Sequence, residues 1–323
     1  MSGSPDGPRG VLHLDAEDIA RLVAPRAAAD AVEAALRDGF DPERCPPRVQ
    51  VDVPAGQLLL MPAASGAYAG VKIAGVAPAN PGRGLRRITG SHLLFDGRTL
   101  LPLAVLDGAA LTALRTPAVS VVALRHLASP AHLAHTVIFG AGPQAYAHLE
   151  AVLQERGLGR LTVVSRHRET AETLVAHARA RDVDARAGVP RDVADADLVI
   201  CCTSAREPLF DGRLVPDRAT VVAVGSHEPD ARETDTALVR RSAVYAEART
   251  VAATEAGDLL IPQAEGAIGP RHLAGTLADL VLGRAGRAEG RPRLFKSVGM
   301  AWEDLAVAAV VHRAAATRDP GAT

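Results

Sequence analysis

The sequence predicts an α/β protein in which a doubly wound parallel sheet of the Rossmann type is inserted into a discontinuous, mainly antiparallel α+β domain. Three observations predict it: a strand, a glycine turn and a helix start that follow one another around residue 140, strand-like segments alternating with helical ones after this unit, and a series of strand-like segments before it. We expect residues 1–117 and a returning C-terminal helix, 297–323, to form one domain, and residues 118–296 the other. A chain of 323 residues is long enough to bury two cores.

The first domain is expected to begin with helical structure over residues 14–36, with Asp15 as the N-cap. The strand-like segments that follow lie at residues 48–53, 57–61, 68–74, 91–95 and 101–106. Such a set indicates a mainly antiparallel sheet. Helices are expected over 107–115 and 119–127. The amphipathic segment 299–315 is expected to return to this domain as a helix, because its apolar face needs a partner.

The segment 135–151 joins a short strand to a helix through a glycine turn that also contains Ala141 and Pro143. Gly140, Gly142 and the small Ala145 match the pattern G-x-G-x-x-G/A. The first glycine allows a tight turn, and the second lets backbone N–H groups approach a pyrophosphate. The helix N-terminus adds a partial positive charge. The flanking strand and helix favour a dinucleotide site over a plain structural turn.

The next expected strand, 161–165, ends where a dinucleotide-binding fold distinguishes between cofactors. An NAD site carries a carboxylate there, whereas this chain has Ser165, Arg166, His167 and Arg168. A hydroxyl and two guanidinium groups suit a 2′-phosphate, so NADP(H) is favoured over NAD(H). The alternative is an arginine that only covers a solvated strand end. The strands expected to complete the sheet lie at residues 197–203, 219–225 and 243–247.

The composition argues against several classes of function. With 36 Lys and Arg against 37 Asp and Glu, and no basic block with interleaved aromatic residues, the chain is not expected to bind nucleic acid. No apolar run reaches the ~18 residues of a membrane helix and no leader pattern is present, which predicts a cytoplasmic protein. Cys45, Cys201, Cys202 and the scattered histidines lack disulfide and metal-ligand spacing, so no metal is expected. Residues 1–10 and 317–323 are expected to be frayed tails.

Lysine occurs only at Lys72 and Lys296, and arginine supplies every other basic side chain. A lysine ammonium is compact and can lose its proton when buried, whereas arginine stays charged. Either these two positions require lysine or the two lysines remain by chance. Lys72 lies in the strand-like segment 69–74, which would bury a charge on one face unless that face lines a site.

Several short segments extend these motifs in a fixed order. They are Met61-Pro62-Ala63, Gly70-Val71-Lys72, Asn80-Pro81, Leu94-Phe95-Asp96, Leu106-Asp107-Gly108, 111–116, 140–145, 255–258 and 295–301. From about Pro47 to the final helix, the chain thereby resembles the ornithine cyclodeaminase and mu-crystallin family. The resemblance implies a nicotinamide cofactor in the Rossmann domain, a small α-amino or α-imino acid as substrate, and a homodimer formed through the other domain.

The resemblance also implies the substrate contacts. Arg48, Lys72 and Arg115 match the family's carboxylate clamp, in which cations fix the substrate α-carbon against the nicotinamide. Lys72 is expected to act in catalysis as well. Met61 and His92 are expected to face the pocket and to influence which side chain it accepts. Without the resemblance, the sequence is equally consistent with Arg48 as a surface arginine and with Arg115 as a charge at a helix end.

The implied cofactor contacts extend from the glycine turn across the Rossmann domain. Beyond that turn they are Arg115, Gln144, Ser165, Arg166, Thr203, Val224, Gly225 and Ser297. Taken alone, Thr203 is equally a core hydroxyl and Ser297 an N-cap. Arg87 departs from the pattern, because the family has a small hydroxyl residue near the cofactor at that position.

The largest departure follows the strand expected at 219–225. Cyclodeaminases and the related alanine dehydrogenases resemble one another in carrying an aspartate acid/base where this chain has His227, and the mu-crystallin branch also lacks it. Cyclisation of ornithine needs a base that handles amine protons, whereas reduction of an oriented iminium needs less. His227 is therefore predicted to donate or relay a proton. The alternatives are that Glu228 takes this role and that His227 only caps the strand.

The sequence thus predicts an NAD(P)H-dependent reductase of a small α-imino carboxylate, such as a cyclic ketimine. One alternative is an ornithine cyclodeaminase that recycles NAD, and another is an amino acid dehydrogenase resembling alanine dehydrogenase. A third is a non-enzymatic protein that binds a small ligand together with NADPH.

Overall fold

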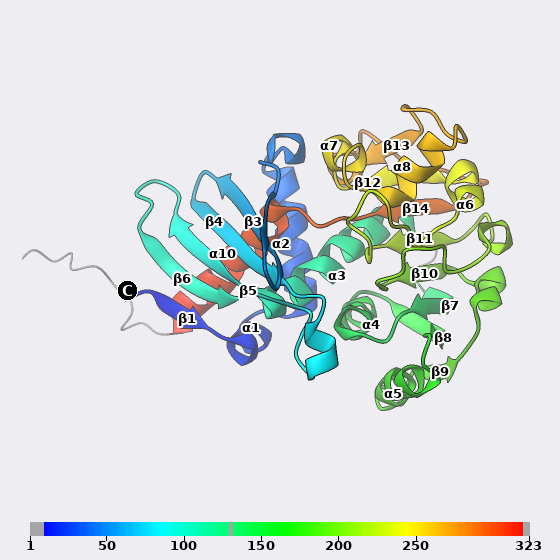
Figure 1. The fold of residues 1–323 in the computed structure, drawn as a ribbon, viewed down its shortest axis with the longest axis horizontal. Coiled ribbons are helices and arrows are strands. Elements are labelled where there is room, and N and C mark those ends of the chain that lie inside the picture. The colour runs from blue at the N-terminus through cyan, green and yellow to red at the C-terminus, as the bar shows by residue number, and fades with distance from the viewer. Residues whose placement is uncertain (1–9, 129–131, 319–323) are drawn as a thin grey trace, which may run out of the picture. The chain divides into compact units, whose positions relative to one another are not determined.

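The computed structural model describes residues 10–128 and 132–318 (Figure 1). The chain folds into two compact units. Unit 1 comprises Met1–Val32, Arg44–Arg115 and Met300–Thr323, and unit 2 comprises Glu33–Glu43 and Thr116–Gly299. Most of unit 2 is thus inserted into unit 1, as the fold class predicted. The tails expected to fray, 1–10 and 317–323, lie mostly outside the described residues.

Unit 1 is built on a six-stranded sheet with the order β1-β6-β5-β4-β3-β2. Its strands are β1 (Leu12–Leu14), β2 (Val49–Val53), β3 (Gly56–Ser65), β4 (Tyr68–Val76), β5 (Ile88–Asp96) and β6 (Pro102–Asp107). β1 pairs with β6 in parallel, and the pairs from β6 to β2 are antiparallel. The predicted, mainly antiparallel sheet is therefore confirmed.

One face of this sheet is covered by α10 (Ala301–Arg318), which contacts β3, β4 and β5 (Figure 1). Alternate residues of the strands are buried, on β4 Gly70, Lys72 and Ala74. The final helix therefore packs on the first sheet as predicted. α1 (Ala16–Leu22) contacts α10 and β6, and the Asp15 side chain accepts a hydrogen bond from the Asp18 N–H, which confirms the N-cap.

Two helix predictions were wrong in detail. The segment 14–36 forms two helices, α1 and α2 (Pro25–Arg37), because a proline disfavours helical backbone at the residue before it. Conversely, the two helices expected over 107–115 and 119–127 are one, α3 (Gly108–Leu127), which continues through Pro117. Its neighbours are buried, so packing outweighs the one hydrogen bond that proline removes.

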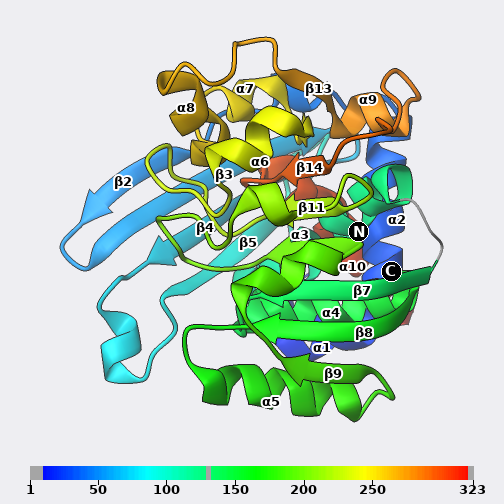
Figure 2. The ribbon, with the colours of Figure 1, turned by 90° about the vertical axis from the view of Figure 1, so that its right-hand side faces the viewer.

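Unit 2 contains an eight-stranded parallel sheet with the order β13-β12-β14-β11-β10-β7-β8-β9. Its strands are β7 (His132–Phe139), β8 (Gly157–Val164), β9 (Asp184–Ala187), β10 (Leu198–Cys201), β11 (Thr220–Ala223), β12 (Ala243–Ala246), β13 (Leu273–Thr276) and β14 (Arg293–Lys296). The chain starts at β7, adds β8 and β9 on one side (Figure 2), and then adds β10 and β11 on the other. The strand order reverses between β7 and β10, which is where doubly wound folds bind nucleotides.

Helices of unit 2 connect these parallel strands. They include α4 (Pro143–Glu155), α5 (Arg168–Arg179), α6 (Thr236–Arg241), α7 (Arg249–Ala252), α8 (Gly257–Ala264) and α9 (Leu277–Val281). Short 3-10 turns occur at Pro42–Arg44, Asn80–Arg83, Pro190–Asp195 and Gly212–Leu214. The core of unit 2 is apolar on the strands, for example at Val137, Val199, Val221 and Leu294. Among the described helices, none has the length and apolar character needed to cross a bilayer.

Four strands were not predicted: β1, β9, β13 and β14. β14 lies between β11 and β12 although it carries Arg293 and Lys296, and both side chains are buried. Arg293 donates to the Arg218 carbonyl, and Lys296 pairs with Asp258. A strand of four residues with two charges has no apolar pattern, so its sequence does not indicate that it lies in the middle of the sheet.

Candidate active site

The glycine turn lies in unit 2, where β7 ends and α4 begins. Gly140 has a φ of +105°, and a Cβ there would lie 2.6 Å from the carbonyl oxygen of Cys202, so this position requires glycine. Gly142 is the N-cap of α4, and no neighbouring heavy atom lies within 4 Å of a Cβ built on it. The small Ala145 is fully buried. The start of α4 thus leaves space beside backbone N–H groups, as a pyrophosphate requires. Of the other predicted residues, Ala141 lies in the turn, and Pro143 and Gln144 are the first two residues of α4.

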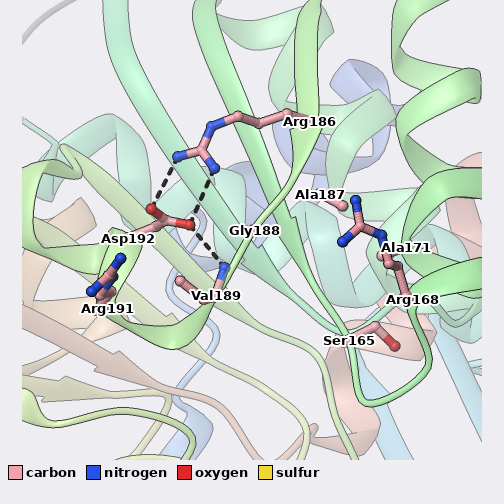
Figure 3. Close-up of a pocket in the computed structure, with 9 residues that line it drawn as sticks. All are labelled: Ser165, Arg168, Ala171, Arg186, Ala187, Gly188, Val189, Arg191 and Asp192. Carbon is pink, nitrogen blue, oxygen red and sulfur yellow. Dashed lines mark hydrogen bonds and ion pairs between the residues drawn. The ribbon is translucent and has the colours of Figure 1, made fainter.

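A pocket opens at the ends of β8 and β9 (Figure 3). Its lining residues are Ser165, Arg168, Ala171, Arg186, Ala187, Gly188, Val189, Arg191 and Asp192. Arg186 Nη2 lies 3.0 Å from Asp192 Oδ1, and Asp192 Oδ2 accepts from the Val189 N–H. The Asp192 carboxylate is therefore engaged within the pocket wall.

The pocket carries three guanidinium groups against one carboxylate. Ser165 and Arg168 were predicted to lie here, whereas Arg166 is exposed and does not line the pocket. Arg186 and Arg191 were missed because they follow β8 by some twenty residues and only β9 brings them back beside it. The excess of positive charge suits a phosphate group.

A buried carboxylate joins the two loops that follow β10 and β11. Glu233 Oε1 accepts from the Thr203 N–H and Oγ1, each at 2.7 Å, and Oε2 accepts from the Gly225 N–H at 2.7 Å. Burial raises the pKa of Glu233, although Lys296 opposes this effect. The hydroxyl of Thr203 is thus already donated to Glu233. Val224, next to Gly225, donates its N–H to the Cys201 carbonyl.

Ser297 is held by a second buried carboxylate. Its Oγ donates to Glu247 Oε1 at 2.5 Å, and the Val298 and Gly299 N–H groups also donate to Glu247. α10 begins only at Ala301. The hydroxyl of Ser297 therefore binds Glu247, not the first turn of that helix.

The loop that carries His227 is tied to its neighbour by ion pairs. Arg206 contacts Glu228 and Asp230, each at 2.5 Å. Lys296 Nζ donates to the Ser226 carbonyl at 2.7 Å and pairs with Asp258. His227 is partly exposed. The Glu228 carboxylate is therefore engaged by Arg206.

In unit 1, the strand register places several predicted residues in one row. Met61 pairs with Lys72, Lys72 with His92, and His92 with Leu106. All four are buried on the face that α10 covers. Arg48 directly precedes Val49, which pairs with Leu60, so the antiparallel register puts Arg48 at the Met61 end of this row.

Lys72 and Arg115 meet on one carboxylate. Lys72 Nζ lies 2.7 Å from Asp304 Oδ2, and Arg115 Nε lies 3.2 Å from Asp304 Oδ1. Arg115 Nη1 lies 2.7 Å from Glu303 Oε2. Lys72 also donates to the hydroxyl of Thr112 at 3.3 Å. The structure therefore brings together two of the three predicted clamp residues, from β4 and α3, through α10.

Burial and opposite charge compete at this cluster. Burial lowers the pKa of Lys72 to about 8; Asp304 counteracts this and Arg115 adds to it. Burial alone would raise the pKa of Asp304, but Lys72 and Arg115 hold it below its usual value. Lys72 thus titrates close to neutral pH, while Asp304 stays ionised.

His92 is fully buried beside Lys72. Burial lowers its pKa to about 4, so the ring is neutral at pH 7. A Cβ at Gly70 would lie 2.6 Å from His92 Nε2, so glycine at position 70 leaves room for the ring. Within the described residues, neither ring nitrogen has a hydrogen-bond partner. Arg87 lies outside this cluster, exposed just before β5.

Sequence reasoning missed Glu303 and Asp304 in unit 1 and Glu233 in unit 2. Glu303 and Asp304 lie in the first turn of the final helix, where acidic residues are common for reasons of helix polarity alone. The signal that could have found them is charge balance, because two buried cations on unit 1 need buried carboxylates. In the described parts of the chain, no group of three His, Cys, Asp or Glu residues is arranged to hold a metal ion.

Comparisons with known proteins identify one family. The profile of the ornithine cyclodeaminase/mu-crystallin family matches residues 12–319. The chain is 36% identical to the ketimine reductase mu-crystallin of Rattus norvegicus over 222 residues, which is 69% of this chain and 68% of that protein.

Two solved structures are similar over nearly their full length. A Δ1-pyrroline-2-carboxylate reductase of Thermococcus litoralis, solved with NADH and L-proline, has a TM-score of 0.90 and 30% identity and covers 95% of this chain and 98% of that one. An archaeal alanine dehydrogenase dimer with bound NAD has a TM-score of 0.89 and 27% identity, with 96% and 97% covered.

Proposed function

Because the chain belongs to the ornithine cyclodeaminase/mu-crystallin family, we propose that it is an NAD(P)H-dependent reductase of a small α-imino carboxylate, such as a cyclic ketimine. The observation that carries this proposal is the pair of buried cations, Lys72 and Arg115, held on one carboxylate of unit 1. The reductase names of relatives in this family support it. In this assignment unit 1 binds the imino acid, unit 2 binds the nucleotide, and the protein is a homodimer, as the archaeal relative is.

The proposed substrate site uses charge to orient an imine. Lys72 and Arg115, with Arg48 at the end of the same row of strand residues, bind the carboxylate and so fix the adjacent C=N carbon. Met61, next to Lys72 in the sheet, contacts the apolar part of the substrate. When bound, the reduced nicotinamide supplies a hydride to that carbon. The imine nitrogen becomes an amine by taking one proton, which His227 or a water molecule donates.

The proposed nucleotide site extends from the glycine turn to the pocket of Figure 3. Gly140, Gly142 and the start of α4 hold the pyrophosphate. Ser165, Arg168 and the neighbouring arginines of the pocket hold a 2′-phosphate, so we propose that NADP(H) is preferred over NAD(H). Thr203, Val224, Gly225 and Ser297 would lie toward the nicotinamide end.

A direct assay tests the function. The purified protein is mixed with NADPH or NADH and with Δ1-pyrroline-2-carboxylate or Δ1-piperideine-2-carboxylate. We expect oxidation of the nucleotide to depend on the imino acid, with a higher kcat/KM for NADPH. If no cyclic or open-chain imino acid is reduced while NADPH binds tightly, the protein is a ligand-binding member of the family instead.

A second candidate is an amino acid dehydrogenase, because the Archaeoglobus fulgidus alanine dehydrogenase is 28% identical over 96% of this chain. It requires oxidation of L-alanine by NAD(P)+ and, in the reverse direction, reductive amination of pyruvate by ammonia and NAD(P)H. A cyclodeaminase is less favoured, because His227 replaces its aspartate and Arg206 engages Glu228. Release of ammonia and proline from ornithine without net cofactor turnover would favour it.

A further inference from the structure

Among the described residues, Asp304 contacts two of the three predicted clamp cations, Lys72 and Arg115, at the distances given above. It lies in the first turn of α10 and is fully buried. Its two oxygens divide between the partners, since Oδ2 faces Lys72 and Oδ1 faces Arg115. Glu303, next to it, contacts Arg115 through Oε2, which also accepts from the Met300 N–H. The two carboxylates are therefore not equivalent.

We propose that Asp304 is a positioning residue that keeps Lys72 protonated and fixes Lys72 and Arg115 at the spacing in which both meet one substrate carboxylate. The proposal rests on the proposed function, because it takes these two cations as the substrate clamp. Asp304 itself acts through them and touches neither the substrate nor the cofactor.

The groups that face Lys72 explain why a carboxylate is needed. From α10 they are Asp304 and, further away, Glu303; from α3, Arg115; and from β5, the neutral His92. β3 contributes the uncharged Met61. Burial and Arg115 both favour loss of the Lys72 proton, and Asp304 is the largest opposing influence. Without it, a neutral amine would face the incoming carboxylate.

The hydrogen bonds of Lys72 and Arg115 fix the positions of these two side chains. A lysine ammonium has three N–H donors, and those of Lys72 to Asp304 and Thr112 use two, which leaves the third for a substrate. Arg115 is oriented through Nε by Asp304 and through Nη1 by Glu303. Both cations are thus held before any ligand arrives, which lowers the entropy cost of binding.

The small number of lysines allows a direct test without substrate. Protein grown with 13C,15N-lysine gives signals from Lys72 and Lys296 alone, and the variant Lys296→Arg assigns them. We expect the Lys72 signals to titrate near pH 8 in the natural protein and below about pH 7 in Asp304→Asn, because burial is then unopposed by the nearest charge. In Asp304→Glu, which keeps the charge, the midpoint should stay near the natural one. An unchanged midpoint in Asp304→Asn would overturn the proposal.

The chain offers a matched control in its other lysine. Asp258→Asn breaks a buried lysine–aspartate pair of the same kind in unit 2. It should disturb the Lys296 signals and leave the Lys72 titration unchanged. If Asp258→Asn moves Lys72 as far as Asp304→Asn does, the effect is a general loss of structure and Asp304 has no specific role.

Kinetics test the consequence for the substrate. In Asp304→Asn we expect the KM for the imino acid to rise at least tenfold between pH 6 and 8, while the natural enzyme changes little below its Lys72 midpoint. kcat at saturation should fall less than kcat/KM, and Asp304→Glu should restore much of the loss. A KM that is equally raised at every pH indicates a merely structural role and contradicts the proposal.

If Asp304→Asn leaves too little folded protein, a double-variant cycle provides a second route. In a Lys72→Met background only the contact of Asp304 with Arg115 remains, so Asp304→Leu should lower kcat/KM by a clearly smaller factor than it does in the natural protein. A loss that multiplies instead would show that Asp304 acts apart from Lys72. If the natural enzyme reduces no imino acid, the proposed function fails, whereas the lysine titration still decides the role of Asp304.

Discussion

At the scale of single residues, the two lysines form two ion pairs in the protein interior. Each is buried and paired with an aspartate, Lys72 with Asp304 and Lys296 with Asp258. Removal of one partner from such a pair leaves an uncompensated charge, which typically costs about 3–5 kcal/mol. The pair in unit 1 is the more exposed of the two, although the Lys72 side chain is only 4% accessible. The proposed function gives the unit 1 pair a role in binding, and we expect the unit 2 pair to serve folding.

The unit 2 pair predicts a large loss of stability in Asp258→Ala. Asp258 also accepts from the Glu233 N–H and from the Thr234 N–H and hydroxyl. We expect the free energy of unfolding to fall by about 3 kcal/mol or more, measured by urea denaturation. Asp230→Ala, which breaks an exposed pair with Arg206, serves as the control and should change it by less than about 1 kcal/mol. Equal losses in the two variants would argue against this assignment.

His92 predicts a pH dependence of stability. Its pKa is about 4 in the folded protein, against an ordinary value of 6.5, so the unfolded chain binds more protons between these values. The free energy of unfolding therefore rises with pH across this window, and a full proton contributes about 1.4 kcal/mol per pH unit. His92→Leu should reduce this slope and should be at least as stable at pH 7, because it removes two buried nitrogens without partners.

His148 provides the contrast. It is also buried with a pKa of about 4, but its ring contacts the Ser120 hydroxyl and the Gln144 carbonyl. His148→Leu should reduce the pH slope as His92→Leu does, yet lower the stability at pH 7. A His92→Leu protein that is clearly less stable at pH 7 would mean that the ring has partners in solution.

At the scale of elements, we expect the two glycines of the turn between β7 and α4 to have different roles, Gly140 in folding and Gly142 in cofactor binding. Ala at position 140 meets both an unfavourable φ and the Cys202 carbonyl, whereas Ala at position 142 meets open space. We expect Gly142→Ala to keep the free energy of unfolding within about 1 kcal/mol and to weaken NADPH binding at least tenfold, because its methyl group occupies the phosphate space. Gly140→Ala should lower both the free energy of unfolding and the affinity for NADPH. Calorimetric titration with NADPH and urea denaturation measure the two effects, and undiminished NADPH binding by Gly142→Ala would place the pyrophosphate elsewhere.

The pocket at the ends of β8 and β9 predicts the choice of cofactor. Arg168 and Arg191 line this pocket, and the Arg168 side chain is 85% accessible. Arg186 also lines it, but its side chain is held by an ion pair with Asp192. Arg168→Ala and Arg191→Ala should each raise the KM for NADPH about tenfold and leave the KM for NADH nearly unchanged. Arg181→Ala, paired with Glu150 outside the pocket, is the matched control. Equal effects on both cofactors would remove the 2′-phosphate from this pocket.

At the scale of the whole molecule, the sequence predicted what periodicity and local motifs encode. The antiparallel strands of unit 1, the glycine turn and the returning helix α10 follow from alternation, glycine spacing and an apolar face. β14 could not be predicted, because its charges are satisfied by groups that are distant in sequence, among them Asp258, the Ser226 carbonyl and the Arg218 carbonyl. The continuation of α3 through Pro117 is likewise decided by tertiary packing.

The candidate site also combines features that local sequence indicates with features that only contacts between distant segments create. Lys72 and Arg115 stand in recognisable segments, but their meeting on Asp304 joins residues 232 and 189 positions apart in the chain. Arg186 and Arg191 reach the pocket of Ser165 only because β9 pairs with β8. The sequence therefore singles out individual candidate residues, whereas the residues that hold them in place depend on contacts between distant segments.

The proposed reaction is tested most directly by following the hydride. NADPH carrying deuterium at the transferable C4 position is mixed with the protein and Δ1-pyrroline-2-carboxylate, and the proline formed is analysed by mass spectrometry and NMR. The account predicts L-proline with one deuterium on its α-carbon, and strongly reduced formation in Arg115→Ala. Proline without deuterium at that carbon, or no proline while NADPH binds, would contradict it.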